Sequence, residues 1–326
     1  MRRLSANNPN ERGAVLLTTM LLMSVMAVLA IGIMADIHLS LNRVVAVQNR
    51  AQAQWYVRGG ESYATLMLGK LAKDAPRFHA AIAEGQRLDF PIENGVIRLS
   101  LADGGNCYNL NALALKKGRK NRQARLIRLF EILEIDPADA ETLVAKITDW
   151  VDSDDIPETG GAEDLTYSNK TPPYHPANRP IIDISELRAI DGLDEPTYQK
   201  IQPLVCALPN KKLSKLNINT LDQKGWPLLA LAFGGTAQAQ AAAQSVIAKR
   251  PANGYESVGD VWQRPEVRAL ELKGSGQSMV STKSKYVIVN VEVQTGINDP
   301  EHALTIHEKI LYDMNGPRRL AIRDAF

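Results

Sequence analysis

Residues 14–35 read AVLLTTMLLMSVMAVLAIGIMA, a run that contains no charged residue. As an α-helix at about 1.5 Å per residue, this run spans about 33 Å, which is enough to cross the roughly 30 Å hydrocarbon core of a membrane. Three arginines lie before the run and Asp36 directly follows it. Because basic residues favour the cytoplasmic side, the sequence predicts that residues 1–13 lie in the cytoplasm and that the chain after Asp36 lies outside.

Two simpler interpretations of this segment remain open. A cleaved secretory signal peptide would have a shorter apolar stretch that ends in a small-x-small motif, of which Ala30-Ile31-Gly32 is a poor version. The segment could also be an uncleaved single-span anchor. Apolar residues, however, continue at roughly helical spacing from Ile37 to Tyr56, and no proline occurs between Glu11 and Ala75. We therefore expect one long helix that starts in a membrane and continues into the folded body.

The first residues resemble the leader of pilins and pseudopilins. A short polar, basic segment ends in Arg12-Gly13, and the apolar run then opens with Ala14-Val15-Leu16-Leu17. In that family a membrane peptidase, the prepilin peptidase, cuts after the glycine. The resemblance implies cleavage between Gly13 and Ala14, with Ala14 as the new, methylated N-terminus.

The fifth residue after this expected cut is Thr18. Most pilins have a glutamate there, and a carboxylate at that depth of a membrane is costly unless it is paired. In the family it pairs with the N-terminal amine of a neighbouring subunit. A subunit with threonine cannot make that contact to a subunit ahead of it, which indicates a place at the tip of a fibre.

The remainder of the chain contains strand patterns near both ends. Residues 88–101 read as a hairpin around Glu93-Asn94-Gly95, because Asn-Gly is a strong hairpin turn signal. Residues 284–295 alternate between apolar and polar side chains, and a further strand is expected at 303–312. We infer one antiparallel sheet, packed on the second half of the long helix.

A long region with helical patterns separates these strands. Helix signals within it occur at 122–133, after the N-cap candidate Asp136, at Ser185, at Glu195 and over 227–249. The predicted fold is α+β and pilin-like, with a long N-terminal hydrophobic helix packed on an antiparallel sheet and a large inserted all-helical domain. The expected parts are a leader (1–13), a transmembrane segment (14–35), the helix and first strands (36–108), the inserted domain (109–274) and the C-terminal strands (275–326).

An ordered set of short motifs gives a more specific resemblance. The motifs are Asn106-Cys107-Tyr108-Asn109, Asp149-Trp150-Val151-Asp152, Gly161-Ala162-Glu163-Asp164, Asn178-Arg179-Pro180 and Leu216-Asn217-Ile218-Asn219. In this order, after a pilin-like leader without the glutamate, they resemble the K-type minor pseudopilins of type II secretion systems. The resemblance covers nearly the whole mature chain and is weakest over 221–280.

This resemblance implies a subunit at the tip of the periplasmic pseudopilus, the fibre that pushes folded exoproteins through an outer-membrane channel. The expected partners are the minor pseudopilins I and J, the prepilin peptidase, the secretion channel and its exoproteins. The expected location is the inner membrane, with a single span, a cytoplasmic N-terminus and a periplasmic C-terminal domain.

The segment from Asp149 to Asp164 is strongly acidic, and no lysine or arginine follows within the sequence until Lys170. A solvated acidic loop is one interpretation, and a bound cation that offsets the repulsion is the other. All candidate ligands are oxygen atoms, which favours Ca²⁺ over Zn²⁺, although the spacing is not that of an EF-hand. The resemblance to K-type pseudopilins also implies Ca²⁺. The expected ligands are Asp152, Asp154, Glu158, Glu163 and Asp164, ahead of Asp149 and Asp155; Asp183 is read as an N-cap.

Cys107 and Cys206 are the two cysteines of the chain. They are either a pair of free thiols or, if this part of the chain is exported into an oxidising compartment, a disulfide. Since the N-terminal segment favours export, we expect the bridge.

An enzyme and a DNA-binding protein are the other classes to weigh. The sequence has no G-x-S-x-G, P-loop or H-E-x-x-H motif, so we expect no catalytic activity. Residues 216–258 also resemble a helix-hairpin-helix module with Gly234-Gly235 as its hairpin, so a membrane-tethered DNA-uptake protein is the second interpretation. Few basic residues lie near that hairpin, and the net charge is only +2, so we expect no nucleic acid partner.

Overall fold

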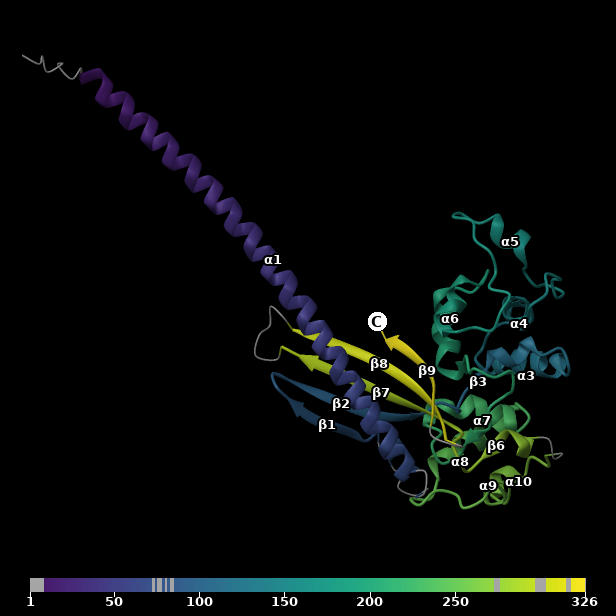
Figure 1. Ribbon diagram of the computed structural model, residues 1–326. Coiled ribbons are helices and arrows are strands. Elements are labelled where there is room, and N and C mark those ends of the chain that lie inside the picture. Colours follow the sequence, from purple (N-terminus) through teal and green to yellow (C-terminus); the bar gives the residue numbers. More distant parts are fainter. Residues whose placement is uncertain are drawn as a thin grey trace, which may run out of the picture.

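The computed structural model describes residues 9–71, 74, 78–79, 81–82, 85–272, 276–296, 303–314 and 318–325. It consists of a long helix, an antiparallel sheet on which the C-terminal half of that helix lies, and a helical domain beyond one end of the sheet (Figure 1). The N-terminal half of the helix projects away from both bodies. This is the α+β, pilin-like arrangement that the sequence predicts.

The longer elements, in chain order, are α1 (Pro9–Leu71), β1 (Arg87–Ile92), β2 (Gly95–Asp103), α3 (Arg119–Ile132), α4 (Pro137–Val151), α5 (Asp164–Ser168), α6 (Glu195–Ile201), α7 (Trp226–Ala232), α8 (Ala237–Ala248), α9 (Val258–Trp262), α10 (Pro265–Arg268), β7 (Tyr286–Thr295), β8 (Leu304–Asp313) and β9 (Arg318–Ala325). Two-residue strands are β3 (Tyr108–Asn109), β4 (Val205–Cys206), β5 (Leu216–Asn217) and β6 (Val280–Ser281). Short 3₁₀ helices are η1 (Leu110–Ala114), η2 (Ile184–Ala189), η3 (Gln202–Leu204), η4 (Gln223–Gly225) and η5 (Gly276–Met279).

Helix α1 is continuous from the apolar segment into the folded body, as predicted. It passes through Gly59-Gly60 without a break. The residues of α1 that meet the sheet recur at helical spacing and are small or aliphatic: Ala53, Val57, Gly60, Ala64 and Leu68. A Cβ atom on Gly60 would lie 3.1 Å from Cγ1 of Val291, so the glycine lets the helix approach the sheet closely.

The sheet has the strand order β1-β2-β7-β8-β9, and every neighbouring pair is antiparallel. The predicted hairpin is confirmed, because β1 and β2 are joined at Ile92 and Gly95, with Asn94 at φ 55° in the turn. The valines of β7 at positions 287, 289, 291 and 293 are buried against α1, as their alternation predicts. Strand β9 extends the sheet beyond β8, at residues 318–325, where the sequence pattern predicts no separate strand.

The helical domain has its own apolar core, separate from the core between α1 and the sheet. Helix α4 begins at Pro137, where the Asp136 side chain accepts the N–H of Ala138 at 2.9 Å, as expected of an N-cap. Asp183 also caps as expected, with a capping box to Glu186, but the segment that it opens is the 3₁₀ helix η2 and not an α-helix.

One expected helix is divided in the structure. The segment over 227–249 forms α7 and α8, which are separated by Gly234 and Gly235 at φ 96° and 73°. Because these values lie in the left-handed region, an α-helix cannot continue through them, and glycine adopts them at little cost. The hairpin that the second interpretation expects at Gly234-Gly235 is therefore where the helix is divided.

Two parallel two-residue ladders tie the helical domain together. Strand β3 pairs with β4, and the predicted disulfide between Cys107 and Cys206 is present beside this ladder, with a Cα–Cα distance of 5.7 Å. Strand β5 pairs with β6, and Val280 of β6 lies in the core of the helical domain. Residues 280–281, which lie beyond the expected limit of this domain at Gly274, therefore pack with it.

The packing of α1 on the sheet yields a prediction for Leu68, which is fully buried. Leu68→Ala removes apolar contacts and leaves a cavity, and should lower the free energy of unfolding by about 2–5 kcal/mol. Chemical denaturation of the full chain in mild detergent, followed by circular dichroism, measures this loss. Leu66 lies on the same helix with a relative exposure of 71%, and Leu66→Ala should change the free energy by less than about 0.5 kcal/mol. Equal effects of the two substitutions would contradict the packing of α1.

Candidate functional site

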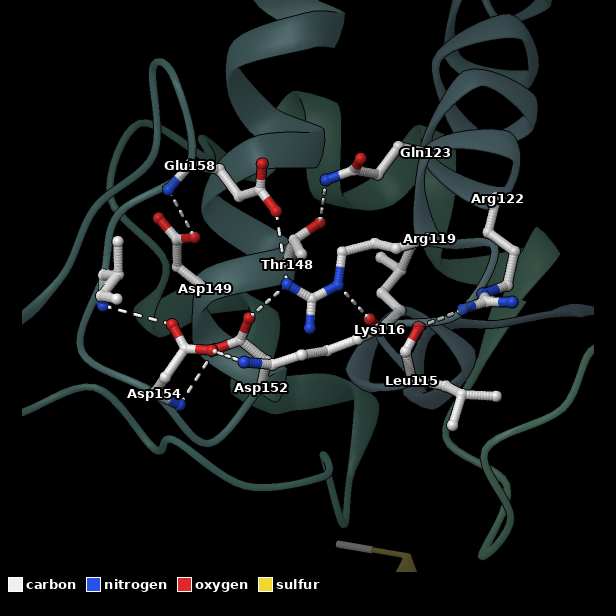
Figure 2. Close-up of polar contacts among 12 residues, drawn as sticks. Leu115, Lys116, Arg119, Arg122, Gln123, Thr148, Asp149, Asp152, Asp154 and Glu158 are labelled. Atoms are coloured by element: carbon white, nitrogen blue, oxygen red, sulfur yellow. Dashed lines mark hydrogen bonds and ion pairs between the residues drawn. The ribbon is translucent and has the colours of Figure 1, made fainter.

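The acidic segment lies between the end of α4 and the start of α5, opposite the N-terminus of α3 (Figure 2). Asp149 belongs to the last turn of α4, and residues 152–163 form the loop that follows. Lys116 and Arg119, from the chain just before α3 and its first residue, reach this loop. The candidate site is therefore built from two helix ends that are about 30 residues apart in the sequence.

Asp149 closes the loop onto the helix that precedes it. Its Oδ1 accepts the backbone N–H of Glu158 at 3.0 Å, and its Oδ2 accepts the N–H of Ala162 at 2.8 Å. Burial raises the pKa of Asp149 to about 6, although the two N–H groups favour the charged form. A Cβ atom on Gly161 would lie 1.9 Å from Oδ2 of Asp149, so only glycine permits this closure.

Arg119 bridges two acidic side chains of the loop. Its Nη1 lies 2.7 Å from Oδ2 of Asp152 and 3.3 Å from Oε1 of Glu158, and its Nε donates to the carbonyl oxygen of Leu113 at 3.0 Å (Figure 2). Lys116 Nζ lies 3.0 Å from Oδ2 of Asp154. The loop thus has cationic partners from outside its own stretch of sequence, which corrects the expectation of uncompensated charge. The basic residues at 116–120 are the sequence signal that could have indicated these cationic partners.

Glu163 differs from its neighbours because its carboxylate has no partner. The residue has a relative exposure of 7%, and neither carboxylate oxygen makes a hydrogen bond. Burial, together with the nearby charges of Asp149 and Asp152, raises the pKa of Glu163 to about 7. A buried carboxylate without a donor or cation is costly when charged. Glu163 therefore either takes up a proton or needs a cation.

Asp164 and Asp155, two other acidic residues considered as ligands, contact different residues. Asp164 contacts Nδ1 of His175 at the surface, and Oδ1 of Asp155 accepts from Nδ2 of Asn178 at 2.7 Å. Asp183 caps η2 and does not belong to the loop. Over the part of the chain that the structure describes, no three acidic, histidine or cysteine side chains converge closely enough to hold a metal ion as they stand. Asp149 and Asp152 lie near enough to Glu163 for their charges to raise its pKa. Arg119 contacts both Asp152 and Glu158, whereas Asp154 contacts Lys116 and Asp164 contacts His175.

The glycine hairpin between α7 and α8 has an internal partner. Nη2 of Arg128, on α3, donates to the carbonyl oxygen of Gly235 at 2.9 Å, and a Cβ atom on Gly235 would lie 2.7 Å from Nε of the same arginine. A hairpin that binds DNA must present its backbone N–H groups to phosphates. Here the hairpin packs against α3, which gives the DNA-binding interpretation no structural support.

Together, these features define a class of protein. Among the described residues, α1 is the helix that is long and apolar enough to span a membrane, and its most apolar part is not buried against the folded body. A projecting apolar helix whose second half backs an antiparallel sheet is the architecture of a pilin-like fibre subunit. In this chain the subunit carries a large helical domain between β2 and β7.

Comparison with known proteins identifies the family. Residues 106–210 and 216–283 match two family models, both described as type II secretion system (T2SS), protein K. The chain is 30% identical to type II secretion system protein K of Pectobacterium carotovorum subsp. carotovorum, over 94% of each chain. It is 33% identical to the Klebsiella pneumoniae protein of the same name, over 81% of this chain and 82% of the relative. The chain belongs to the type II secretion system protein K family.

A solved structure agrees with this assignment. The fold is similar to a chain in the crystal structure of the GspK-GspI-GspJ complex from the enterotoxigenic Escherichia coli type 2 secretion system. The TM-score is 0.69 at 27% identity, and the match covers 87% of this chain and 99% of the other. The chain is accordingly a minor pseudopilin, a structural component of type II secretion, whose N-terminal apolar helix suits an inner-membrane anchor.

The isolated carboxyl group of Glu163 yields a pH prediction. Its pKa is about 7 in the folded chain against an ordinary 4.5, so folding favours the protonated form. The stabilisation is complete below about pH 4.5 and is lost as the pH rises through 7. With a chelator present, the free energy of unfolding should fall by up to about 3 kcal/mol across this range.

Glu163→Gln should remove most of the slope between about pH 6 and 7, which lies above the pKa of Asp149 at about 6, and urea unfolding at a series of pH values measures it. Glu141 lies exposed on α4, and Glu141→Gln should leave the slope unchanged. The same slope in the wild type and in Glu163→Gln would show that the Glu163 carboxyl is not the group that titrates.

Proposed function

We propose that this chain is the tip subunit of a type II secretion pseudopilus and acts in the export of folded proteins without catalysing a reaction. In this proposal, residues 14–35 span the inner membrane, residues 1–13 are cytoplasmic until the prepilin peptidase cuts between Gly13 and Ala14, and the body after Asp36 is periplasmic. The observation that carries the proposal is the continuity of α1. One helix joins an exposed apolar segment to the sheet, so the folded body cannot separate from its anchor without unfolding.

Two features support a place at the tip. Thr18 stands where most pilins have the glutamate that pairs with the amine of a neighbouring subunit, and its hydroxyl bonds within the helix to the carbonyl oxygen of Val15. The helical domain lies beyond the sheet at the end away from the apolar half of α1 (Figure 1). A further subunit stacked above would meet this domain.

The partners follow from the solved relative, which was crystallised as a GspK-GspI-GspJ complex. We propose that this chain likewise assembles with minor pseudopilins I and J, and that the assembled tip meets the secretion channel and exoproteins. The exposed residues of α1 near Trp55 and Leu66 provide apolar surface for such helix packing.

The assembly is tested by isolating the full chain from membranes that also contain the I and J subunits. We expect all three to co-purify in mild detergent, with Ala14 as the N-terminus of this chain by mass spectrometry. Gly13→Leu should block the cut and leave the leader attached. A chain that retains Met1 in the wild type, or that binds neither I nor J, would overturn the proposed function.

We also propose that the acidic loop binds Ca²⁺. The support is Glu163, whose carboxylate oxygens are buried and unpartnered beside Asp149 and Asp152, in a setting that offers only oxygen ligands. Glu163 and Asp152 would hold the ion, together with loop carbonyl groups or waters, because both are buried at the acidic centre. Asp152 would have to exchange its contact with Arg119 for the ion, and Asp154, Glu158 and Asp164 contribute only if they leave Lys116, Arg119 and His175.

Calcium removal provides the test of this site. Because a ligand that binds only the folded state stabilises it, Ca²⁺ at about 100 times its dissociation constant should raise the melting temperature of the chelated full chain by about 5–10 °C. Mg²⁺ at the same concentration should have a much smaller effect, since it requires a rigid octahedral site. Glu163→Gln should abolish the Ca²⁺ response while Glu141→Gln keeps it. A melting temperature indifferent to Ca²⁺ would remove the site from the proposal and leave the secretion assignment intact.

A further inference from the structure

The sheet and the helical domain meet at a small junction. The chain leaves the sheet at the end of β2 and returns to it at the start of β7. The two large apolar cores are separate, and among the residues that the structure describes a small apolar cluster of Leu208, Tyr286 and Leu311 lies apart from both. Domains joined through small, largely polar contacts are expected to move relative to each other. A fixed orientation therefore requires specific contacts at the two crossings.

Asp103 lies at the first crossing and contacts both bodies. Its Oδ1 accepts the N–H of Gly105 at 2.7 Å. Its Oδ2 accepts the hydroxyl of Thr220 at 2.5 Å, and the same oxygen accepts the hydroxyl of Ser284 from the second crossing. One carboxylate thus joins the chain that leaves the sheet, the segment after β5 in the helical domain, and the chain that returns.

Two asparagines complete a closed ring of hydrogen bonds around this carboxylate. Oδ1 of Asn106 accepts the N–H of Asn217 at 2.7 Å, and its Nδ2 donates to the hydroxyl oxygen of Thr220 at 3.1 Å. Nδ2 of Asn217 donates to the hydroxyl oxygen of Ser284 at 2.7 Å. The ring therefore runs through Asp103, Thr220, Asn106, Asn217 and Ser284.

The donors and acceptors of this ring fix the chemical role of Asp103. Each hydroxyl has a single hydrogen and accepts an amide N–H, so that hydrogen can be donated to Asp103; for Thr220 the Asp103 oxygen at 2.5 Å is closer than the Asn217 carbonyl oxygen at 3.3 Å. Oδ1 also faces a donor, the N–H of Gly105. An amide in place of the carboxylate would set its NH₂ group either against the N–H of Gly105 or against the two hydroxyls, which would then have to turn their hydrogens away from residue 103. The carboxylate accepts on both oxygens and so receives all three donors in the orientation that the structure shows.

We infer that Asp103 is a positioning residue, whose hydrogen-bonded ring holds the helical domain in one orientation on the pilin-like sheet. The disulfide cannot replace it, because it lies beside the ladder between β3 and β4 and so links the helical domain internally. The bond from Nδ2 of Asn210 to the Tyr286 hydroxyl, at 2.8 Å, is a second crossing contact, but it holds one point only. The ring is formed within this chain and without a metal ion.

Spin–spin distance measurement on the full chain in detergent tests this inference. Spin labels are attached through a genetically encoded keto amino acid, which leaves the native disulfide intact, at exposed Lys200 in the helical domain and exposed Thr305 on β8. The wild type should give one narrow distance peak. Asp103→Asn and, separately, Ser284→Ala should replace this peak with a broad distribution. A second pair of labels at Lys120 and Lys200, both within the helical domain, should remain narrow in every variant.

Asp89 provides the matched control. It lies on β1 and is largely exposed, with Oδ2 3.7 Å from Nε of Arg98, so Asp89→Asn makes the same chemical change away from the junction and should keep the narrow peak. If Asp103→Asn does not fold, Ser284→Ala still tests the ring, because it removes only the Ser284 hydroxyl donor. A broad peak in the wild type, a narrow peak in both ring variants, or equal broadening in Asp89→Asn would each overturn the inference.

Discussion

The close contact between the second half of α1 and the sheet is the constraint on which the rest of the structure depends. Ala53, Gly60 and Ala64 have small or no side chains, so the valines of β7 pack directly against this face of the helix. This face converts an apolar helix into part of a folded core. The position of the sheet, and of everything attached to it, is thereby defined relative to the apolar half of α1. Without this face, the chain would be a folded body on a separate anchor.

Much of the fold could be predicted because its signals are local. The uncharged run at 14–35, the Asn94-Gly95 turn and the alternation along β7 each depend on neighbouring residues only. The predictions of helices and strands fail where a local sequence signal is weak or fits more than one structure. The Gly234-Gly235 pair breaks one apparent helix into two, and η2 begins with a good cap but closes as a 3₁₀ helix. The pattern of residues 318–325 does not predict a strand by itself, and pairing with β8 defines it.

The acidic loop shows why a site is harder to predict than a fold. The sequence indicates the loop itself, because acidic residues follow one another between Asp149 and Asp164. It does not indicate that Arg119 will lie between Asp152 and Glu158, since this contact depends on how α3 packs on α4. Nor does it distinguish Glu163, buried without a partner, from Asp164, which lies at the surface one residue later. Charge balance in such a loop is a property of the packed domain.

The disulfide has a consequence for the survival of the helical domain in a compartment that contains proteases. Exposed loop tips are the usual places of proteolytic cleavage, and Ile156 lies in such a loop with a relative exposure of 74%. Because Cys107 and Cys206 enclose this loop, one cut there leaves two polypeptide pieces that remain covalently joined. The pieces also share one apolar core. A nicked subunit can therefore stay assembled and keep its shape, and only reduction of the bridge would let the fragments part.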